Sequence, residues 1–507
     1  MMPEERKETP EHPGPGAGGP AGARDAGLMS PIRAGTPVEA ALTDEAWLSA
    51  MLDAEVALAC AQARIGMIPW SSADAIAASA RGWRCDPVML ARRAREAANP
   101  VVALVQELTR EVAGRYPDAA DDVHLGSTSQ DILDTATMLL AAHALDLISD
   151  DLDRVCSALE GLAERHRDTP MAARTLTQHA VPTTFGLKAA GWLHAADGAR
   201  QRLKALRTEL PVQLGGAAGT LAAYHEYATL DGVKGRNGES AALELMSVFA
   251  EEVGLAEPVL PWHSAREPVA RVCCELAVMA GVLGKFGTDV QNLVRTEVAE
   301  AVEPGAEGRG ASSAMPQKRN PVLSALLVSA ALQLPSHATV LLHCMAAEGE
   351  RSAGAWHAEW QPLREALRIA GGAAYTAAEL AEGLVPLSGA MARNLALTQG
   401  QIVAERLVVH LRSAVGKAEA KRHLGRIAAS SAGGESFACA VRADPVVRES
   451  LSPDLLDEIL DPAGYQGAAG ELVDRALTHH RLHTRSASEA AAERGGTRPE
   501  PCERTPQ

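Results

Sequence analysis

The chain has 507 residues, which is too long for a single hydrophobic core, so we expect two or three domains. Hydrophobic residues make up 47% of it and aromatic residues only 3%, a composition that favours closely packed helices rich in Ala and Leu. The formal net charge of −16 argues against a nucleic-acid partner, although a local cationic pocket remains compatible with a small anionic substrate.

The N-terminal part of the chain is predicted to be a tail followed by helices. Residues 1–27 are poor in large apolar side chains and are expected to be disordered. A Thr-Asp pair at Thr43 is typical of a helix start, and the helix that follows carries Trp47, Met51 and Leu58 on one side. The chain shows neither β-α-β alternation nor an internal repeat, and we expect it to be almost entirely helical between its tails. The second disordered tail is expected to begin at about residue 485.

The first segment with a chemical motif, at residues 123–136, reads VHLGSTSQDILDTA. Its hydroxyl side chains are Ser127, Thr128 and Ser129. They precede a long helix predicted from Ile132 to about Arg165, and hydroxyl and N–H groups at a helix start form a carboxylate site. Asp131 and Asp134 suit the first turn, where the helix dipole favours acids. Taken alone, the segment is explained equally well as a helix cap.

The second segment, at residues 174–192, reads RTLTQHAVPTTFGLKAAGW. Gln178 and His179 precede a Pro-Thr-Thr step and the predicted start of a new helix. A single histidine in such a place is more often structural than catalytic. The segment by itself therefore leaves both interpretations open.

The residues from 269 to 293 give the clearest helix prediction. Apolar side chains recur at alternating steps of three and four, an a/d heptad pattern: Val269, Val272, Leu276, Met279, Leu283, Phe286, Val290 and Leu293. A helix of this length extends over about 37 Å. Its apolar stripe needs partners along its whole length, so we expect a long-helix bundle that is shared between subunits.

The most informative segment, at residues 310–321, reads GASSAMPQKRNP. Its two prolines interrupt regular backbone hydrogen bonding. The glycines at 305, 308 and 310 make the segment that leads into the loop mobile. The loop presents two hydroxyls, two cations and an amide, which suits an anionic substrate that gains negative charge during reaction. An ordinary polar loop is the alternative. A further helix is predicted after Pro321, and Pro335 is expected to kink or end it.

The remaining sequence features predict a cytoplasmic protein with neither a metal nor a cofactor. The N-terminal segment lacks the apolar region of a signal peptide, and no apolar run reaches the roughly 18 residues of a membrane span. None of the eight cysteines forms a C-x-x-C pair, as is typical of reduced thiols. The sixteen histidines show no H-E-x-x-H or other metal-binding spacing.

Together, the three motifs resemble those of the fumarase/aspartase superfamily. The GASSAMPQKRNP loop resembles its signature, the T-S-x-D segment its first active-site region, and Q-H-A-x-P-T-T its second. Within the superfamily, the sequence is most similar to the bacterial 3-carboxy-cis,cis-muconate cycloisomerases, over about residues 28–480. Shared stretches include VHLG-x-TSQD, LGGAAGTLAA, PWH, WHAEW, NLALTQG and LDPAGYQG.

The resemblance implies an all-α fold of three helical domains around a central bundle of long helices. The implied division is an N-terminal helical domain at 28–124, a central bundle at 125–366 and a C-terminal helical domain at 367–484, with disordered tails at 1–27 and 485–507. It also implies a homotetramer in which each active site takes its three regions from three different subunits.

The chemistry that the resemblance implies is addition or elimination beside a carboxylate. A base removes the proton α to the carboxylate, the resulting dianionic aci-carboxylate is stabilised, and a leaving group departs from the adjacent carbon. By motif position Ser312 would be the base, its alkoxide stabilised by N–H groups and cations. Lys318 and Asn320 would stabilise the aci-carboxylate, and the glycine-rich approach fits a closing lid. The substrate-binding residues would be Asn99, His124, Thr128, Ser129, Gln178, His179, Ser313, Met315 and Arg351.

Two departures from the family pattern concern the substrate, which we expect to be an anionic di- or tricarboxylate. Many superfamily lyases have Thr-His where this chain has Thr175-Leu176, and leucine cannot protonate a leaving group. We therefore expect a leaving group that departs as a stable anion, unless His179 or His124 acts as the acid. Gly349 replaces a histidine that is typical of the cycloisomerases, which leaves the substrate open.

Three functions follow from these observations. The first is a 3-carboxy-cis,cis-muconate cycloisomerase of aromatic catabolism, in which a carboxylate leaves. The alternative is a C–N lyase that eliminates nitrite from nitrosuccinate and yields fumarate. The third is a non-enzymatic protein on the same scaffold, which the intact Ser-Lys-Asn set disfavours.

Overall fold

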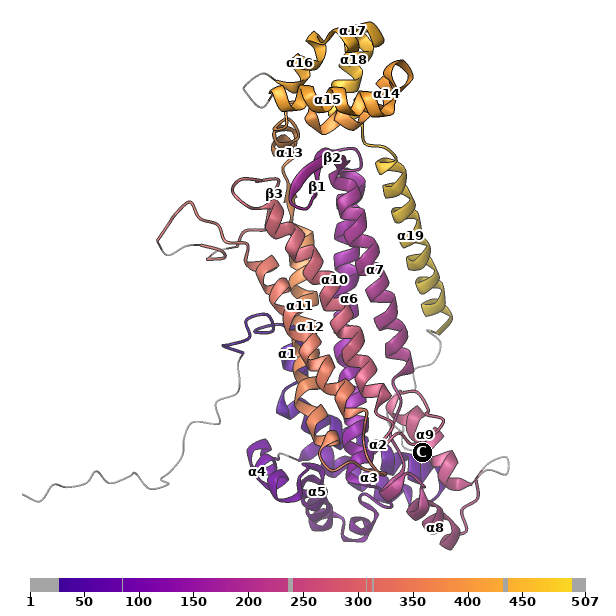
Figure 1. Cartoon of the computed structure of the whole chain (residues 1–507). Coiled ribbons are helices and arrows are strands. Elements are labelled where there is room, and N and C mark those ends of the chain that lie inside the picture. Colours follow the sequence, from indigo (N-terminus) through magenta and orange to yellow (C-terminus); the bar gives the residue numbers. More distant parts are fainter. Residues whose placement is uncertain are drawn as a thin grey trace, which may run out of the picture.

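The computed structural model describes residues 27–494, except 84, 236–239, 307, 312–313 and 432–435. Helices dominate the described residues, as predicted, and the named strands form two antiparallel two-stranded sheets. Figure 1 shows a tall bundle of long helices with a smaller group of helices at each end. The three-part helical architecture is therefore confirmed.

The lower group in Figure 1 consists mainly of N-terminal helices. These are α1 (Pro37–Ala41), α2 (Asp44–Ile65), α3 (Trp70–Gly82), α4 (Pro87–Ala97) and α5 (Val101–Arg115), joined by α8 (Ala222–Leu230) and α9 (Ala241–Val253). The predicted start of α2 is confirmed, because the Thr43 hydroxyl accepts a hydrogen bond from the N–H of Ala46 at 3.2 Å. Met51 and Leu58 are buried and Trp47 is half-buried.

The central bundle is built from long helices that alternate in direction along the chain. They are α6 (Ser129–Arg165), α7 (Phe185–Glu209), α10 (Glu267–Leu293), α11 (Val322–Cys344) and α12 (Ala355–Gly383). The hairpin of β1 (Pro170–Thr175) and β2 (Gln178–Thr184) joins α6 to α7 at the upper end. The short strands β3 (Ala301–Val302) and β4 (Val385–Pro386) pair near the same end. The long helix predicted from Ile132 to Arg165 is thus confirmed as α6.

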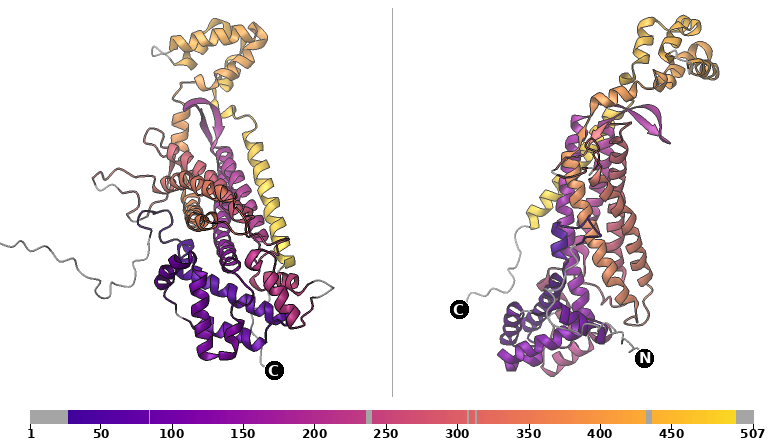
Figure 2. Two further views of the ribbon diagram at one scale, coloured as in Figure 1. Left: turned by 60° about the horizontal axis from the view of Figure 1, so that its bottom comes forward. Right: turned by 90° about the vertical axis from the view of Figure 1, so that its left-hand side faces the viewer.

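All eight heptad residues of α10 are buried within the single chain, with at most 3% of each exposed. Their partners are α7, α11 and α12, which run beside α10 in Figures 1 and 2. A Cβ at Gly284 would clash with Ala331 of α11, so glycine permits a close helix approach there. The predicted bundle is confirmed. The chain's own helices cover the stripe, so its burial needs no second subunit, and the sharing of the bundle between subunits stays a prediction.

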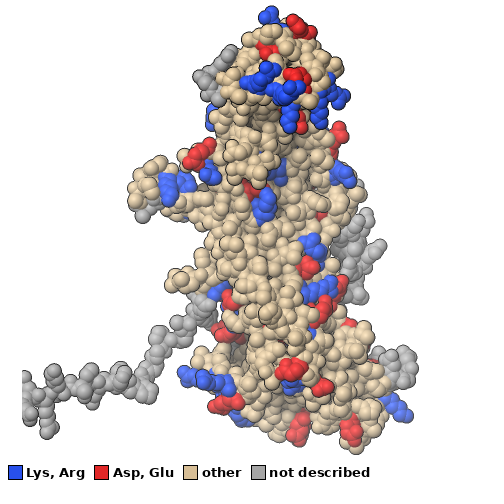
Figure 3. All heavy atoms as spheres, in the orientation of Figure 1, with Lys and Arg blue, Asp and Glu red and all other residues tan. Residues whose placement is uncertain are grey.

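The helix α11 has one apolar face that the chain itself leaves uncovered. Both α6 and α11 are long and apolar enough to cross a membrane, but 78% of the apolar window of α6 is buried, against 28% for α11. Leu332 of α11 is 77% exposed and Leu342 is 50% exposed. In Figure 3, the face over α11 carries few charged side chains. The helix also continues past Pro335 to Cys344, so this proline does not end it.

A second hydrophobic core lies in the upper group of helices. These are α13 (Ser388–Leu395), α14 (Ala404–Val415), α15 (Lys417–Ser431), α16 (Phe437–Ala443), α17 (Pro445–Ser450) and α18 (Pro453–Leu460). Residue 366, the predicted end of the central domain, lies inside α12, and this second core begins at Leu395, apart from Ala172 of β1. The last helix, α19 (Ala469–Arg494), returns beside α7 and continues beyond residue 484, where a disordered tail was predicted.

Candidate active site

At the lower end of the bundle, two segments far apart in the sequence meet at the start of α6. Thr128 is the N-cap of α6 and Ser129 is its first residue. Arg351, in the loop between α11 and α12, donates from Nη2 to the Thr128 hydroxyl at 2.7 Å. Its Nε donates to the Gln130 side-chain carbonyl at 3.0 Å. The structure therefore places a guanidinium beside the N-terminus of α6, and both groups attract an anion.

His124 lies four residues before Thr128, with a positive φ of 60°. Its Nδ1 is 2.7 Å from Oε1 of Glu55, a carboxylate that is 2% exposed. Burial lowers the pKa of His124, but the charge and hydrogen bond of Glu55 raise it, and the net shift is upward. His124 therefore forms a pair with a buried carboxylate beside the same end of α6.

Asn99, another predicted substrate ligand, caps α5. Its side-chain oxygen accepts hydrogen bonds from the N–H groups of Val101 at 3.1 Å and Val102 at 3.2 Å. A helix cap of this kind occupies the acceptor oxygen of the side chain. Asn99 thus has a structural role that is visible within the single chain.

Asp131 fixes the start of α6 from inside the protein. It is fully buried and accepts hydrogen bonds from the N–H groups of Gly215 at 2.8 Å and Gly216 at 3.0 Å. Nε2 of His263 is 2.9 Å from the same carboxylate. A Cβ at Gly215 would lie 2.9 Å from the His263 ring, so only glycine fits there. Asp131 positions Thr128 and Ser129 rather than facing a substrate.

The second motif lies at the opposite end of α6, in the hairpin of β1 and β2. Gln178 is exposed, and His179 is half-buried beside Arg174. Arg174 donates two hydrogen bonds, at 2.7 and 2.8 Å, to the fully buried carboxylate of Glu300. Burial and the neighbouring guanidinium lower the pKa of His179. Leu176, at the hairpin tip, is 96% exposed with a φ of 48°.

The third motif is the loop before α11. Ser312 and Ser313 lie outside the described residues, whereas Met315, Lys318 and Asn320 are described and exposed. The ends of the loop are held together, because the Asn320 N–H donates to the Gly310 carbonyl at 2.9 Å. A Cβ at Gly310 would lie 2.6 Å from the Asn320 carbonyl oxygen, and its φ is +68°, so this position requires glycine.

One chain does not bring the three motifs together. Thr128 begins α6, a helix of 37 residues, and His179 follows the hairpin beyond its far end. At 1.5 Å per residue these two residues are separated by about 55 Å. Figure 1 shows the loop before α11 projecting sideways from the bundle. The structure joins Thr128, Ser129 and Arg351, and it keeps His179 and Lys318 apart from them.

Two residues that were not predicted as site residues from the sequence lie beside predicted site residues. Gln130 holds Arg351, and Arg174 lies next to His179. Arg174 opens the second motif, so a cation in that segment was visible in the sequence. The role of Gln130 depends on Arg351, which is 221 residues away, and no local pattern signals such a contact.

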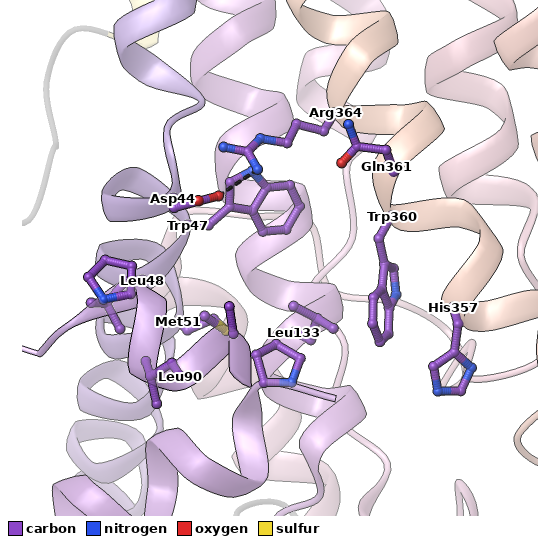
Figure 4. Close-up of a pocket in the computed structure, with 13 residues that line it drawn as sticks. Asp44, Trp47, Leu48, Met51, Leu90, Leu133, His357, Trp360, Gln361 and Arg364 are labelled. Atoms are coloured by element: carbon purple, nitrogen blue, oxygen red, sulfur yellow. Dashed lines mark hydrogen bonds and ion pairs between the residues drawn. The ribbon is translucent and has the colours of Figure 1, made fainter. Parts of the chain in front are cut away.

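A separate cavity of about 310 Å³ lies between α2, α4 and α12. Figure 4 shows Trp47, Met51 and Trp360 around it, with Arg364 paired to Asp44 at 2.6 Å. None of the predicted site residues lines this cavity. Its lining is largely apolar and the labelled charges are already paired, so the reaction is not assigned to it.

Comparison with known proteins relates two regions of the chain, 36–335 and 400–476, to lyases. The model of the lyase family matches residues 36–335, and that of the adenylosuccinate lyase C-terminus matches residues 400–476. The nitrosuccinate lyase of Streptomyces davaonensis is 57% identical over 454 residues, which cover 89% of this chain and 94% of that protein. The 3-carboxy-cis,cis-muconate cycloisomerase of Pseudomonas aeruginosa is 42% identical over 88% of this chain and 94% of its own.

The crystal structure of the 3-carboxy-cis,cis-muconate lactonizing enzyme from Pseudomonas putida has a similar fold. The TM-score is 0.82 at 37% sequence identity, and the match covers 90% of this chain and 100% of the other. The similarity therefore includes the end groups of helices as well as the bundle.

Proposed function

The chain belongs to the lyase family of the fumarase/aspartase superfamily, and on this premise we propose that it eliminates nitrite from nitrosuccinate and releases fumarate. The observation that carries this proposal is the 57% identity to a nitrosuccinate lyase across nearly the whole of both chains. The cycloisomerase relative shares 42%, with the same coverage of its own length. The enzyme is thus a superfamily lyase, and the proposal concerns its substrate.

The proposed reaction needs one base and a leaving group that departs unaided. A base takes the proton from the carbon next to one carboxylate, and that carboxylate becomes a dianionic aci-carboxylate. The electron pair then forms the C=C bond, and the C–N bond breaks with its electrons on nitrite. We assign the base to Ser312 and the stabilisation of the aci-carboxylate to Lys318 and Asn320, in accordance with the motif position.

The other carboxylate of the substrate is assigned to the lower end of the bundle. Thr128 and Ser129 offer their hydroxyls, and Ser129 its N–H, at the positive end of α6, whereas the Thr128 N–H donates to Oδ2 of Asp131 at 3.3 Å. Arg351 adds a guanidinium 2.7 Å from the Thr128 hydroxyl. His124 lies at the same end of α6 and is paired with the buried carboxylate of Glu55, which raises its pKa on balance despite burial. These groups suit a dianionic substrate because they concentrate positive charge at one point of an acidic protein.

A leaving group that departs as an anion agrees with the residues of the second motif. Leu176 stands where many superfamily lyases have a histidine, and it offers no proton. The pKa of His179 is lowered by burial and Arg174, so this histidine is mainly neutral at neutral pH. Arg174 is the cation next to it, and its charge is opposed by Glu300. We therefore propose that nitrite leaves without being protonated.

Introducing the missing histidine tests that proposal. We expect Leu176→His to leave turnover of nitrosuccinate unchanged or lower, because no proton is required. The hairpin tip is 96% exposed, so the larger polar ring costs little stability. The measurement is nitrite release against pH, with Leu230→His, an exposed substitution on α8, as the control. A large rise in turnover with a new pH limb near the histidine pKa of about 6.5 would instead mean that protonation limits the native reaction.

We further propose that the enzyme is a cytoplasmic homotetramer with shared active sites. The main support is the separation of about 55 Å between Thr128 and His179 along α6, which one chain cannot close. The exposed apolar face of α11 also supports assembly through the bundles. In the single chain Leu332 and Leu342 of this face are exposed to solvent, and packing against another subunit would bury them. Each site would then combine the start of α6, the hairpin and the loop before α11 from different subunits.

Mixing two inactive variants tests whether the sites are shared. We expect Ser312→Ala and Arg351→Met each to be inactive when expressed alone. When the two are co-expressed, we expect about one quarter of wild-type activity. If each site takes Ser312 from one subunit and Arg351 from another, random mixing leaves both residues wild type in about one quarter of the sites. Arg351→Met with Thr128→Ala is the matched control. Those two residues touch within one chain, so this pair should regain nothing. No recovery in either pair would place each site inside one subunit.

The second candidate is the cycloisomerase reaction, which the fold similarity to the lactonizing enzyme favours. Incubation with nitrosuccinate and, separately, with 3-carboxymuconate discriminates between the two. We expect stoichiometric nitrite and fumarate from the first substrate and no change in diene absorbance with the second. The reverse result would establish the cycloisomerase. The space beside Gly349 is open, and its φ of +63° is one that non-glycine residues in general rarely adopt.

A further inference from the structure

We propose that α7 and α19 together bind a divalent transition-metal ion of the zinc class, with His479, His483 and Asp197 as ligands. The site lies where the last helix returns beside the bundle, to the right of α7 in Figure 1. It contains none of the residues assigned to the elimination. The ion would fasten the C-terminal helix to the bundle and would take no part in the reaction.

The ligand geometry follows from two helical faces that meet. His479 and His483 are one turn apart on α19, and their ring centroids are 4.1 Å apart. Asp197 of α7 faces them, and its Oδ2 is 3.0 Å from Nδ1 of His483. One ligand atom from each of the three residues lies within 4.8 Å of the other two. Ligand atoms around a zinc ion stand roughly 3.3 Å apart, so the three side chains would move closer together when an ion binds.

A fourth ligand is available from the same face of α7. His194 lies one turn before Asp197, and its ring centroid is 5.4 Å from that of His479. Three imidazoles and one carboxylate form a donor set that suits zinc, cobalt or nickel and does not suit calcium or magnesium, which prefer oxygen ligands. His194 or a water molecule would complete the tetrahedral coordination.

The side chains around Asp197 hold its carboxylate in place, whereas the imidazoles of His479 and His483 are accessible from solvent. Asp197 is 1% exposed, and its Oδ1 accepts hydrogen bonds from Arg200 at 2.6 Å and from His480 at 3.1 Å. Its Oδ2 faces His483 and Gln201. Hydrogen bonds of this kind orient a ligating carboxylate. His479 is exposed and His483 half-buried, so an ion reaches the ligands from solvent.

Arg200 pairs with two carboxylates, and the second of them reduces the electrostatic repulsion between Arg200 and a bound cation. The guanidinium donates to Asp153 at 2.6 Å as well as to Asp197. The alternative group of Cys156, Asp197 and His480 is fully buried. An ion from solvent instead reaches the side of Asp197 that faces His479 and His483, so that side is the better site.

The sequence alone did not reveal this group. His479 and His483 have the spacing of four residues that places two ligands on one helical face, but that pair is common by chance. The third ligand lies on a helix 286 residues earlier in the chain. The packing of α19 on α7 brings the three side chains together.

Metal binding by the full-length protein tests the proposal. After dialysis against EDTA, titration with Zn²⁺ by calorimetry and with Co²⁺ by visible absorption should show one ion per chain with a tetrahedral cobalt spectrum. We expect His479→Gln with His483→Gln to weaken binding at least ~100-fold. These side chains are exposed or half-buried, so the double variant should fold.

His423→Gln is the matched control, because His423 pairs with Asp444 at 2.8 Å without a second histidine nearby on its helix. It should bind zinc as the wild type does. Zinc should also raise the melting temperature of the wild type and of this control, but not that of the double variant. Nitrite release should be the same with and without zinc. Absence of binding by the wild type, or equal binding by the double variant, would overturn the proposal and leave the cluster as a hydrogen-bond network.

Discussion

Replacing Ser312 by Ala is expected to lower turnover by at least ~10³-fold, the scale lost when an activated base is removed. The expectation rests on the position of Ser312 as the first serine of the GASSAMPQKRNP loop. Turnover is measured as nitrite or fumarate produced at saturating substrate. Fold and assembly, checked by circular dichroism and light scattering, should be unchanged, because the loss is chemical.

The matched control for this variant is Ser413→Ala. Ser413 is an exposed serine on α14, far from the three motifs in the sequence, and its hydroxyl donates only a long bond of 3.4 Å to His410. Its turnover should equal that of the wild type. If Ser312→Ala retains activity within tenfold of the wild type, the base is another residue, and the hydroxyls of Thr128 and Ser129 become the next candidates.

Replacing Arg266 by Met is expected to destabilise the protein by ~3–5 kcal/mol, as when one partner of a buried ion pair is removed. The Arg266 guanidinium binds the carboxylate of Asp134 at 2.6 and 3.1 Å. It also binds Glu359 at 2.7 and 3.0 Å. All three side chains are at most 2% exposed. The variant would leave two buried carboxylates without a cation at the junction of α6, α10 and α12.

The measurement is urea unfolding at a fixed protein concentration, compared with Arg271→Met. Arg271 pairs with Glu209 at 2.5 Å, but the two side chains are 42% and 50% exposed. This control should lose less than about 1 kcal/mol. A loss in Arg266→Met no larger than in the control would mean that the buried triad relaxes or takes up water.

The stability deficit of Arg266→Met should depend on pH in a defined direction. Burial raises the pKa of Glu359, and Arg266 opposes that shift. Without the guanidinium, the pKa in the folded state rises further above that in the unfolded state, so the folded state binds more protons. Stability therefore falls as pH rises through the new pKa, and the deficit is smallest at acidic pH.

The features that the sequence determined by itself rest on local patterns. The heptads of α10 were visible because burial on one side of a helix requires apolar residues every three to four positions. The Thr43 cap follows from the needs of a single backbone N–H group, and it is found as expected. The three motifs were recognisable because each is a short run of residues whose types, in that order, are rare.

Tertiary structure alone decided the features that depend on contacts across the chain. The stripe of α10 is covered by α7, α11 and α12, a distribution that the periodicity of one helix cannot specify. The hairpin turn at Leu176 and Thr177 has positive φ at both residues without the glycine or asparagine that usually signals such a turn. Arg351 meets Thr128, and His483 meets Asp197, across more than 200 residues. Such pairings depend on how whole helices pack, and no local window of sequence records them.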